Sequence, residues 1–125
     1  MSVSDKFTDV VRKVVGADWV QLNKSSLSFY SQDALGVGSL PDLVVIPGST
    51  KEIASIARLC NQEGVPLVVR GGGTGYTGGA VPTHGGMLLS MERFNRILEI
   101  DEASLLAVVE PNVITVDLKS EAEQI

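Results

Sequence analysis

The sequence predicts an α+β fold with α/β character: a small parallel sheet flanked by helices, followed by the start of a second, antiparallel sheet. Three observations favour this fold. An apolar strand, an amphipathic helix and another apolar strand follow one another over residues 43–69, a glycine-rich loop begins directly after them, and two apolar segments separated by a short turn lie within residues 97–109. Strands that alternate with helices are typical of parallel sheets, and short turns join antiparallel strands.

The composition describes a folded, acidic chain. Its 125 residues fit one domain, and because 44% of them are hydrophobic, disorder is not expected. The net charge is −5 and no cluster of Lys and Arg occurs, which argues against a nucleic-acid partner. The N-terminus lacks the features of a signal peptide, and no run approaches the ~20 apolar residues of a transmembrane segment. We therefore expect a cytoplasmic protein whose single cysteine, Cys60, packs in the core.

Residues 1–40 are expected to form an N-terminal helix and loop. Apolar residues recur at helical spacing from Phe7 to Val15, and Gly16 is suited to end the helix. Residues 17–40 are rich in Ser, Asn, Gly and Asp, so they predict a loop with one short helix or strand at most.

The next segment predicts a strand, a helix and a second strand. The run Leu43–Ile46, between two prolines, is typical of a buried strand. Ser49 and Glu52 form a capping-box pattern, and Gly64 matches the glycine that follows a helix. The helix between them presents an apolar face made of Ile53, Ile56, Ala57 and Cys60. Residues 65–69 predict a second buried strand, parallel to the first across a right-handed crossover.

The C-terminal part predicts a further strand, a strand pair and a helix. Met87–Ser90 is the further strand, and the pair consists of Ile97–Ile100 and Leu105–Val109. A helix is expected from Val113, with Thr115 as a candidate N-cap. The sequence stops within this helical pattern, so we expect a truncated unit.

The glycine-rich loop is the strongest candidate for a binding site. Eight of the thirteen glycines lie between Gly71 and Gly86, although glycine is costly to order. Successive bare N–H groups form a concave nest that suits a pyrophosphate, and Thr74 and Thr77 add hydroxyl groups. The loop follows a strand, at the edge where parallel sheets bind ligands. Arg70 has two candidate partners, a phosphate or strand carbonyls.

Other phosphate-binding motifs fit the loop less well. Gly73–Gly78 matches G-x-G-x-x-G, but Gly79 and Pro82 follow where the Rossmann fold needs a helix. No lysine lies between Lys51 and Lys119, which excludes a Walker A site. A kinase glycine loop also fails, since its Val-Ala-Ile-Lys strand is missing. A surface loop without a ligand remains the structural alternative.

Several ordered segments resemble the FAD-binding domain of FAD-linked oxidases of the vanillyl-alcohol-oxidase type. They are PDLVVIP at 41–47, STKE at 49–52, RGGGTG at 70–75 with the glycines at 78–79, MERFNRI at 91–97 and VEP at 109–111. Within that family, MERFNRI and RLCNQEGVP at 58–66 most resemble the group of glycolate oxidase D-subunits and D-lactate dehydrogenases. The resemblance covers the chain from about Ser31 to its end.

The resemblance implies that residues 41–125 are the first subdomain of an FAD-binding domain, truncated at its C-terminus. FAD would lie along it, with its pyrophosphate on the amides of Gly71–Gly75. The residues implied to bind the cofactor are Pro47, Arg70, Gly71, Gly72, Gly73, Thr74, Gly75, Tyr76, Thr77, Gly78, Gly79, Pro111 and Asn112.

Three of these positions depart from the family pattern. Asn112 replaces the usual glycine, although Asn tolerates positive φ better than most residues. Tyr76 is bulkier than the leucine or serine common there. Thr74 stands where some relatives attach FAD through a histidine, so non-covalent binding is expected.

No catalytic or metal-binding residue is expected in this fragment. His84, the one histidine, is expected at the surface, and Asp33 in a turn. By resemblance, the complete protein would oxidise a small 2-hydroxy acid such as glycolate or D-lactate. The alternatives are a non-catalytic nucleotide- or anion-binding module, a subunit that completes an FAD site with a partner chain, or a folded remnant without a ligand. Exposed edges of the 97–109 strand pair predict self-association or a partner chain.

Overall fold

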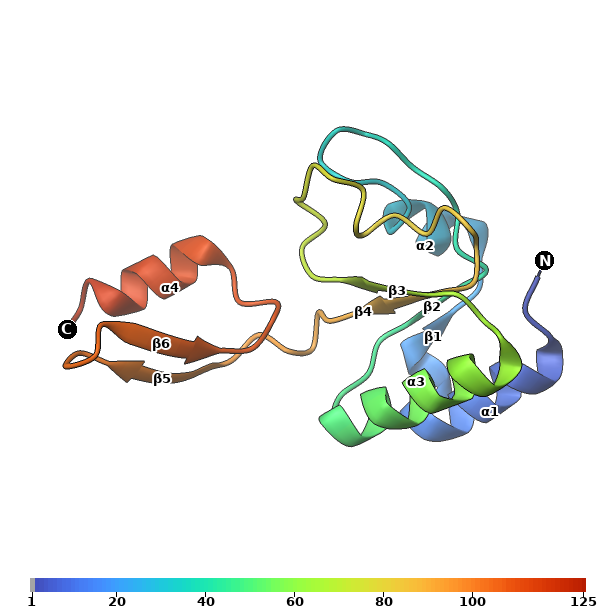
Figure 1. The fold of residues 1–125 in the computed structure, drawn as a ribbon, viewed down its shortest axis with the longest axis horizontal. Helices are drawn as coiled ribbons and strands as arrows, with labels where there is room; N and C mark the ends of the chain where they lie inside the picture. Colours follow the sequence, from blue (N-terminus) through green and yellow to red (C-terminus); the bar gives the residue numbers. More distant parts are fainter. Residues whose placement is uncertain (1) are drawn as a thin grey trace.

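The computed structural model describes residues 2–125, which form a sheet with helices on both faces and a separate lobe of two strands and one helix (Figure 1). The predicted α+β fold is confirmed. In chain order, the elements are α1 (Asp5–Val15), the 3-10 turn η1 (Ala17–Trp19), β1 (Val20–Gln21), α2 (Lys24–Phe29), β2 (Leu43–Val45), α3 (Thr50–Glu63), β3 (Leu67–Arg70), β4 (Met87–Ser90), β5 (Ile97–Asp101), β6 (Leu106–Val109) and α4 (Thr115–Ala122).

The larger sheet has four strands in the order β1-β2-β4-β3. β2, β4 and β3 run parallel, as predicted for the strand–helix–strand segment, while β1 pairs antiparallel with β2. Because β4 lies between β2 and β3, the strand β3 is left at the edge of the sheet. The expectation of a buried second strand is therefore wrong, and Val69 is 54% exposed.

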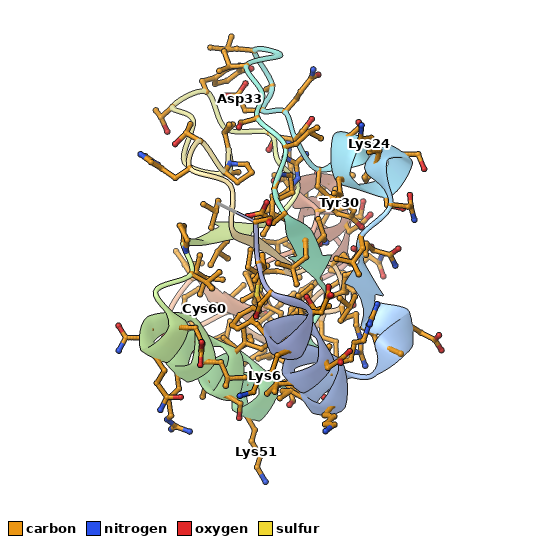
Figure 2. All side chains as sticks on the ribbon, turned by 90° about the vertical axis from the view of Figure 1, so that its right-hand side faces the viewer. Lys6, Lys24, Tyr30, Asp33, Lys51 and Cys60 are labelled. Carbon is orange, nitrogen blue, oxygen red and sulfur yellow. The ribbon has the colours of Figure 1, made fainter. Side chains whose placement is uncertain are left out.

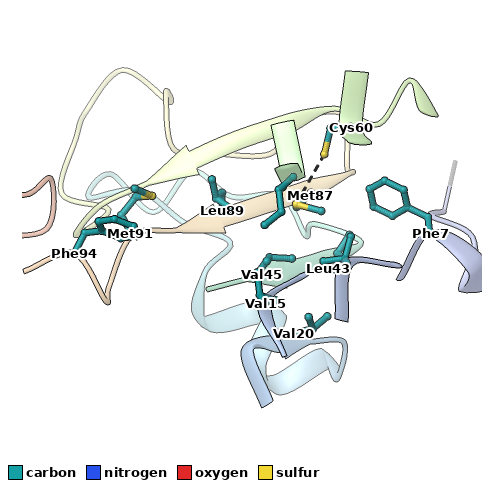
Figure 3. Close-up of a cluster of buried hydrophobic side chains, with 12 residues drawn as sticks. Phe7, Val15, Val20, Leu43, Val45, Cys60, Met87, Leu89, Met91 and Phe94 are labelled. Atoms are coloured by element: carbon teal, nitrogen blue, oxygen red, sulfur yellow. Dashed lines mark hydrogen bonds between the residues drawn. The ribbon is translucent and has the colours of Figure 1, made fainter. Parts of the chain in front are cut away.

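The core lies on the face of the sheet that α1 and α3 cover (Figure 3). Figure 2 shows these two helices together at one end of the molecule, opposite the loop that carries Asp33. Cys60 is buried as predicted, and its thiol lies 3.9 Å from the sulfur of Met87. The other face of the sheet packs against Leu27 of α2, through Val44, Ile46 and Leu88.

The predicted boundaries of α3 are confirmed. The Ser49 hydroxyl accepts a hydrogen bond from the Glu52 N–H at 3.2 Å, and the Glu52 carboxylate reaches back to the N–H of Gly48 at 2.6 Å. Gly64 ends the helix in the left-handed region, with φ +66°. Ala57, however, is exposed. The buried stripe of the helix runs through Ile56 and Cys60. Ala57 follows Ile56 and is therefore rotated by ~100° about the helix axis, away from this stripe.

The N-terminal forty positions contain more structure than predicted. α1 and its end at Gly16 are confirmed, but residues 17–40 hold η1, β1 and α2 rather than a single short element. β1 is only two residues long, so its sequence carries no alternating pattern. Asp33 is a turn residue as predicted, since its carboxylate accepts the N–H groups of Leu35 and Val37.

The second lobe contains β5, β6 and α4, and its antiparallel strand pair is confirmed. The Arg96 guanidinium and the Glu110 carboxylate join the open end of the pair at 2.8 Å. All of β6 is exposed. α4 begins at Thr115, so the N-cap is Ile114 and the predicted capping role of Thr115 is wrong. None of the helices within residues 2–125 is long and apolar enough to cross a membrane.

Candidate functional site

Three backbone segments meet at the carboxyl edge of the parallel strands. β2 leads into Ile46–Ser49, β3 into the glycine loop at 71–79, and β4 into the turn at 91–94. Figure 1 shows the glycine loop rising from the end of β3 and lying beside the loop that follows α2. The Ala34 N–H donates to the Gly75 carbonyl at 3.2 Å, which joins these two loops.

The amides of the glycine loop are free. Within the part of the chain that the structure describes, no N–H group of residues 71–79 donates a hydrogen bond to another backbone group outside the regular elements. Gly73 and Gly78 adopt positive φ, at +70° and +76°. Backbone in this conformation turns neighbouring N–H groups toward one side and forms an anion-binding concavity. Thr74 and Thr77 are exposed, so their hydroxyl groups remain accessible.

At two glycines of the loop, neither the backbone conformation nor a contact within residues 2–125 requires glycine. A Cβ atom added at Gly75 or Gly79 would meet no heavy atom within 4 Å, and neither residue needs a positive φ. A Cβ at Gly71, in contrast, would lie 3.4 Å from the carbonyl oxygen of Pro111. A loop that is bare on its open side fits a ligand that approaches the main chain closely.

Arg70 caps carbonyl groups. Its Nη1 donates to the Gln32 carbonyl at 2.6 Å and to the Tyr30 carbonyl at 3.4 Å, in the segment after α2 rather than in a strand. Its guanidinium also occupies the space where a Cβ of Gly73 would lie. Arg70 therefore packs against the glycine loop and donates hydrogen bonds to the loop that follows α2, so it links the two loops.

The other expected site residues lie close to the loop or at the same edge. Pro47 is fully buried at the end of β2. The Pro111–Asn112 turn reaches the start of the glycine loop, and the Asn112 N–H donates to the Phe94 carbonyl at 2.8 Å. Among the described non-glycine residues only Leu105 has a positive φ. Asn112 therefore forms this turn without the positive φ that a glycine in its place could adopt. Tyr76 is 70% exposed.

A polar cluster at the same edge was not anticipated from the sequence. The Tyr30 hydroxyl donates to Glu92 Oε1 at 2.6 Å, and the Ser90 hydroxyl donates to the same oxygen at 3.0 Å. Burial first, and then the hydrogen bond and charge of Glu92, raise the pKa of Tyr30 to about 12. No local pattern could reveal the cluster, because Tyr30 and Glu92 lie far apart in the sequence.

His84 lies away from this edge. It is exposed, as predicted, and its Nδ1 lies 3.1 Å from the Thr83 hydroxyl. It lines a depression with Asp42, which immediately precedes β2, and with Pro66, which immediately precedes β3. The depression therefore lies at the amino ends of these strands.

An α/β sheet whose carboxyl edge carries an open loop of free amides defines a domain for binding nucleotide phosphates. The comparison with protein families agrees with this class. The model of the FAD binding domain family matches residues 41–124, and the chain belongs to that family. The resemblance to FAD-linked oxidases is therefore confirmed, and FAD is the cofactor of the family.

Individual relatives support the same assignment. The chain is 48% identical over 90 residues to the glycolate oxidase subunit GlcD of Bacillus subtilis, a match that covers 71% of this chain and 19% of that protein. It is 34% identical over 84 residues to a D-lactate dehydrogenase of Anaerostipes hadrus, covering 67% of this chain and 18% of the relative. The chain thus spans about a fifth of the length of these curated relatives.

A solved structure shares the fold. The 4-ethylphenol oxidase of Gulosibacter chungangensis superposes with a TM-score of 0.83 at 30% identity, over 98% of this chain and 25% of that one. The similarity includes the N-terminal helix and both lobes, since nearly the whole chain is aligned.

Proposed function

We propose that this chain holds the pyrophosphate of FAD, without a covalent bond, within an FAD-dependent oxidoreductase that acts on small 2-hydroxy acids such as glycolate or D-lactate. FAD supplies the redox chemistry of such enzymes, and the protein supplies binding and orientation. The contribution proposed for this chain is binding. The substrate class rests on the names of the two curated relatives, one a glycolate oxidase subunit and the other a D-lactate dehydrogenase.

The observation that carries the proposal is the open, unbonded backbone of the glycine loop. A diphosphate offers several acceptor oxygens to the N–H groups of Gly71–Gly75, and Thr77–Gly79 would complete the cradle. Arg70 contributes through its contact with Gly73, and the Pro111–Asn112 turn by closing on Gly71. Pro47 contributes through the turn that follows it, and Tyr76 borders the open side.

A second candidate is a subunit that completes an FAD site together with a partner chain. The observation that favours it is the exposure of β6, which leaves one edge of the small sheet without a neighbour. In this case the glycine loop has the same role, and the partner contributes the remaining contacts to the cofactor.

Titration of the chain with FAD, followed by flavin fluorescence, tests the proposal. We expect Gly75→Val to weaken binding at least about tenfold, because its side chain projects into the space proposed for the pyrophosphate, where the loss of close contact costs ~1.4 kcal/mol or more. The fold should be unaffected, since Gly75 has open surroundings and no positive φ.

The matched control is Ala57→Val, which adds two methyl groups at an exposed position of α3. Its affinity for FAD should equal that of the wild type. ADP and inorganic pyrophosphate, titrated in competition, test whether the loop holds the phosphates, because a phosphate cradle binds both. The proposal fails if the wild-type chain binds neither FAD nor pyrophosphate, or if Gly75→Val binds FAD as well as the wild type.

A further inference from the structure

Arg93 extends from the end of β4 to the turn that follows β2. Its guanidinium carbon lies 4.1 Å from the centre of the Trp19 ring, within the range of a cation–π contact. Its Nη1 donates to the Ile46 carbonyl at 3.3 Å. The Ile46 N–H in turn donates to the Trp19 carbonyl at 2.9 Å. Trp19 thus bonds to the N–H of Ile46, and Arg93 bonds to its carbonyl.

Gly48 leaves space for the side chain of Arg93. A Cβ atom at Gly48 would overlap the Arg93 guanidinium, which fills that space. Gly48 is not among the glycines with positive φ, so its backbone conformation is open to any residue. The guanidinium therefore fills the space that Gly48 leaves open, and a larger residue here would have to displace it. The Gly48 N–H is bonded to the Glu52 carboxylate, which ties the turn to the first turn of α3.

Within residues 2–125, no carboxylate forms an ion pair with Arg93. The ion pairs among residues 2–125 are Arg12–Asp9 and Arg96–Glu110. The contacts of the guanidinium are instead with the Trp19 ring in η1 and with the Ile46 carbonyl and Gly48 in the segment that leads from β2 into α3. These contacts point to a structural or positioning role.

We propose that Arg93 is a positioning residue of the FAD site, acting through Ile46–Gly48. Its guanidinium holds the turn at the end of β2 in place, at the edge of the sheet where the cofactor is proposed to lie, and Gly48 leaves room for it. This inference rests on the proposed function, because it assigns the turn a role in FAD binding. It differs from the role of Arg70, which supports the glycine loop itself.

A double-mutant cycle tests the proposal in the chain without cofactor. Trp19 is the only tryptophan, so its fluorescence reports on the stacked guanidinium. We expect Gly48→Ala to displace the arginine and to raise the quenching of Trp19 by acrylamide. Arg93→Ala should raise quenching to a similar level, and Gly48→Ala should add nothing further when combined with Arg93→Ala.

The same four proteins are then titrated with FAD. Arg93→Ala and Gly48→Ala should each weaken binding about tenfold, and the double variant should be no weaker than Arg93→Ala alone. The control is Arg58→Ala, which removes an equal charge from an exposed position of α3 and should leave both readouts unchanged. Urea unfolding midpoints measured in parallel separate lost stability from lost positioning.

Additive losses in the cycle, or an equal loss of affinity in Arg58→Ala, would overturn the proposal. FAD affinity that follows the unfolding midpoint across all four proteins would overturn it as well, since the arginine would then be structural only. If the wild type binds no FAD, the proposed function fails and the positioning role in FAD binding fails with it. The Trp19 quenching cycle still shows in that case whether Arg93 holds the turn.

Discussion

At the scale of single residues, two arginines occupy the space that two glycines leave open. Arg70 packs against Gly73, and Arg93 packs against Gly48. In both pairs the guanidinium also donates to backbone carbonyls. A glycine near a binding loop therefore does not have to face the ligand. Sequence reasoning singled out the glycine cluster as a candidate site, but it could not separate glycines with an open side from those that an arginine packs against.

Cys60 gives a prediction on pH dependence. Burial raises the pKa of its thiol from 9.0 to about 11. A raised folded pKa means that the protonated thiol stabilises the fold fully below pH 9, and that this stabilisation is lost as the pH rises through 11. Urea unfolding of the wild type should therefore lose stability over this interval relative to Cys60→Ala, which has no thiol. A constant difference between the two proteins from pH 8 to pH 11 would contradict the assignment.

At the scale of elements, α3 and its flanking strands were predictable because their signals are local. The capping residues, the glycine at the helix end and the apolar runs all lie within the segment they define. The position of β4 between β2 and β3 was not predictable, since strand order depends on contacts between residues far apart in the sequence. For the same reason the exposure of β3 and the contacts of Tyr30 with Glu92 could not be foreseen.

The N-cap of α3 gives a second prediction. Ser49→Ala removes the acceptor for the Glu52 N–H and should reduce the free energy of unfolding by ~1 kcal/mol. The matched control is Ser120→Ala in α4, where the hydroxyl bonds back to the Val116 carbonyl and caps no free N–H group. That change should be neutral within ~0.5 kcal/mol. Equal losses in the two variants, measured by urea denaturation, would show that the cap contributes nothing.

At the scale of the whole molecule, the two lobes differ in how completely they are packed. The larger sheet has helices on both faces, and its central strands β2 and β4 are buried. The second lobe has no buried residue in β5, β6 or α4. A two-stranded sheet is only marginally stable by itself. We therefore expect this lobe to be the less stable of the two.

From this exposure we expect self-association through β6. The strand carries no charged residue, whereas β5 carries Glu99 and Asp101, which would repel a second acidic copy. We expect sedimentation velocity to show concentration-dependent dimers, and Val108→Lys to shift the population toward monomer. Ser120→Lys adds the same charge on α4 and should leave the dimers intact. A wild-type profile that stays monomeric at all concentrations would exclude association through this edge.

The central place of β4 has a consequence for the order in which the protein folds. β2 and β3 make no backbone pairing with each other, and each pairs with β4. Both strands are synthesised before residues 87–90, so neither has its parallel partner until then. The parallel pairings therefore form only once β4 is available, which requires closure of the glycine-rich segment at 71–86. Until that step, the apolar strand β2 depends on β1 and α1 for shelter from proteases and aggregation.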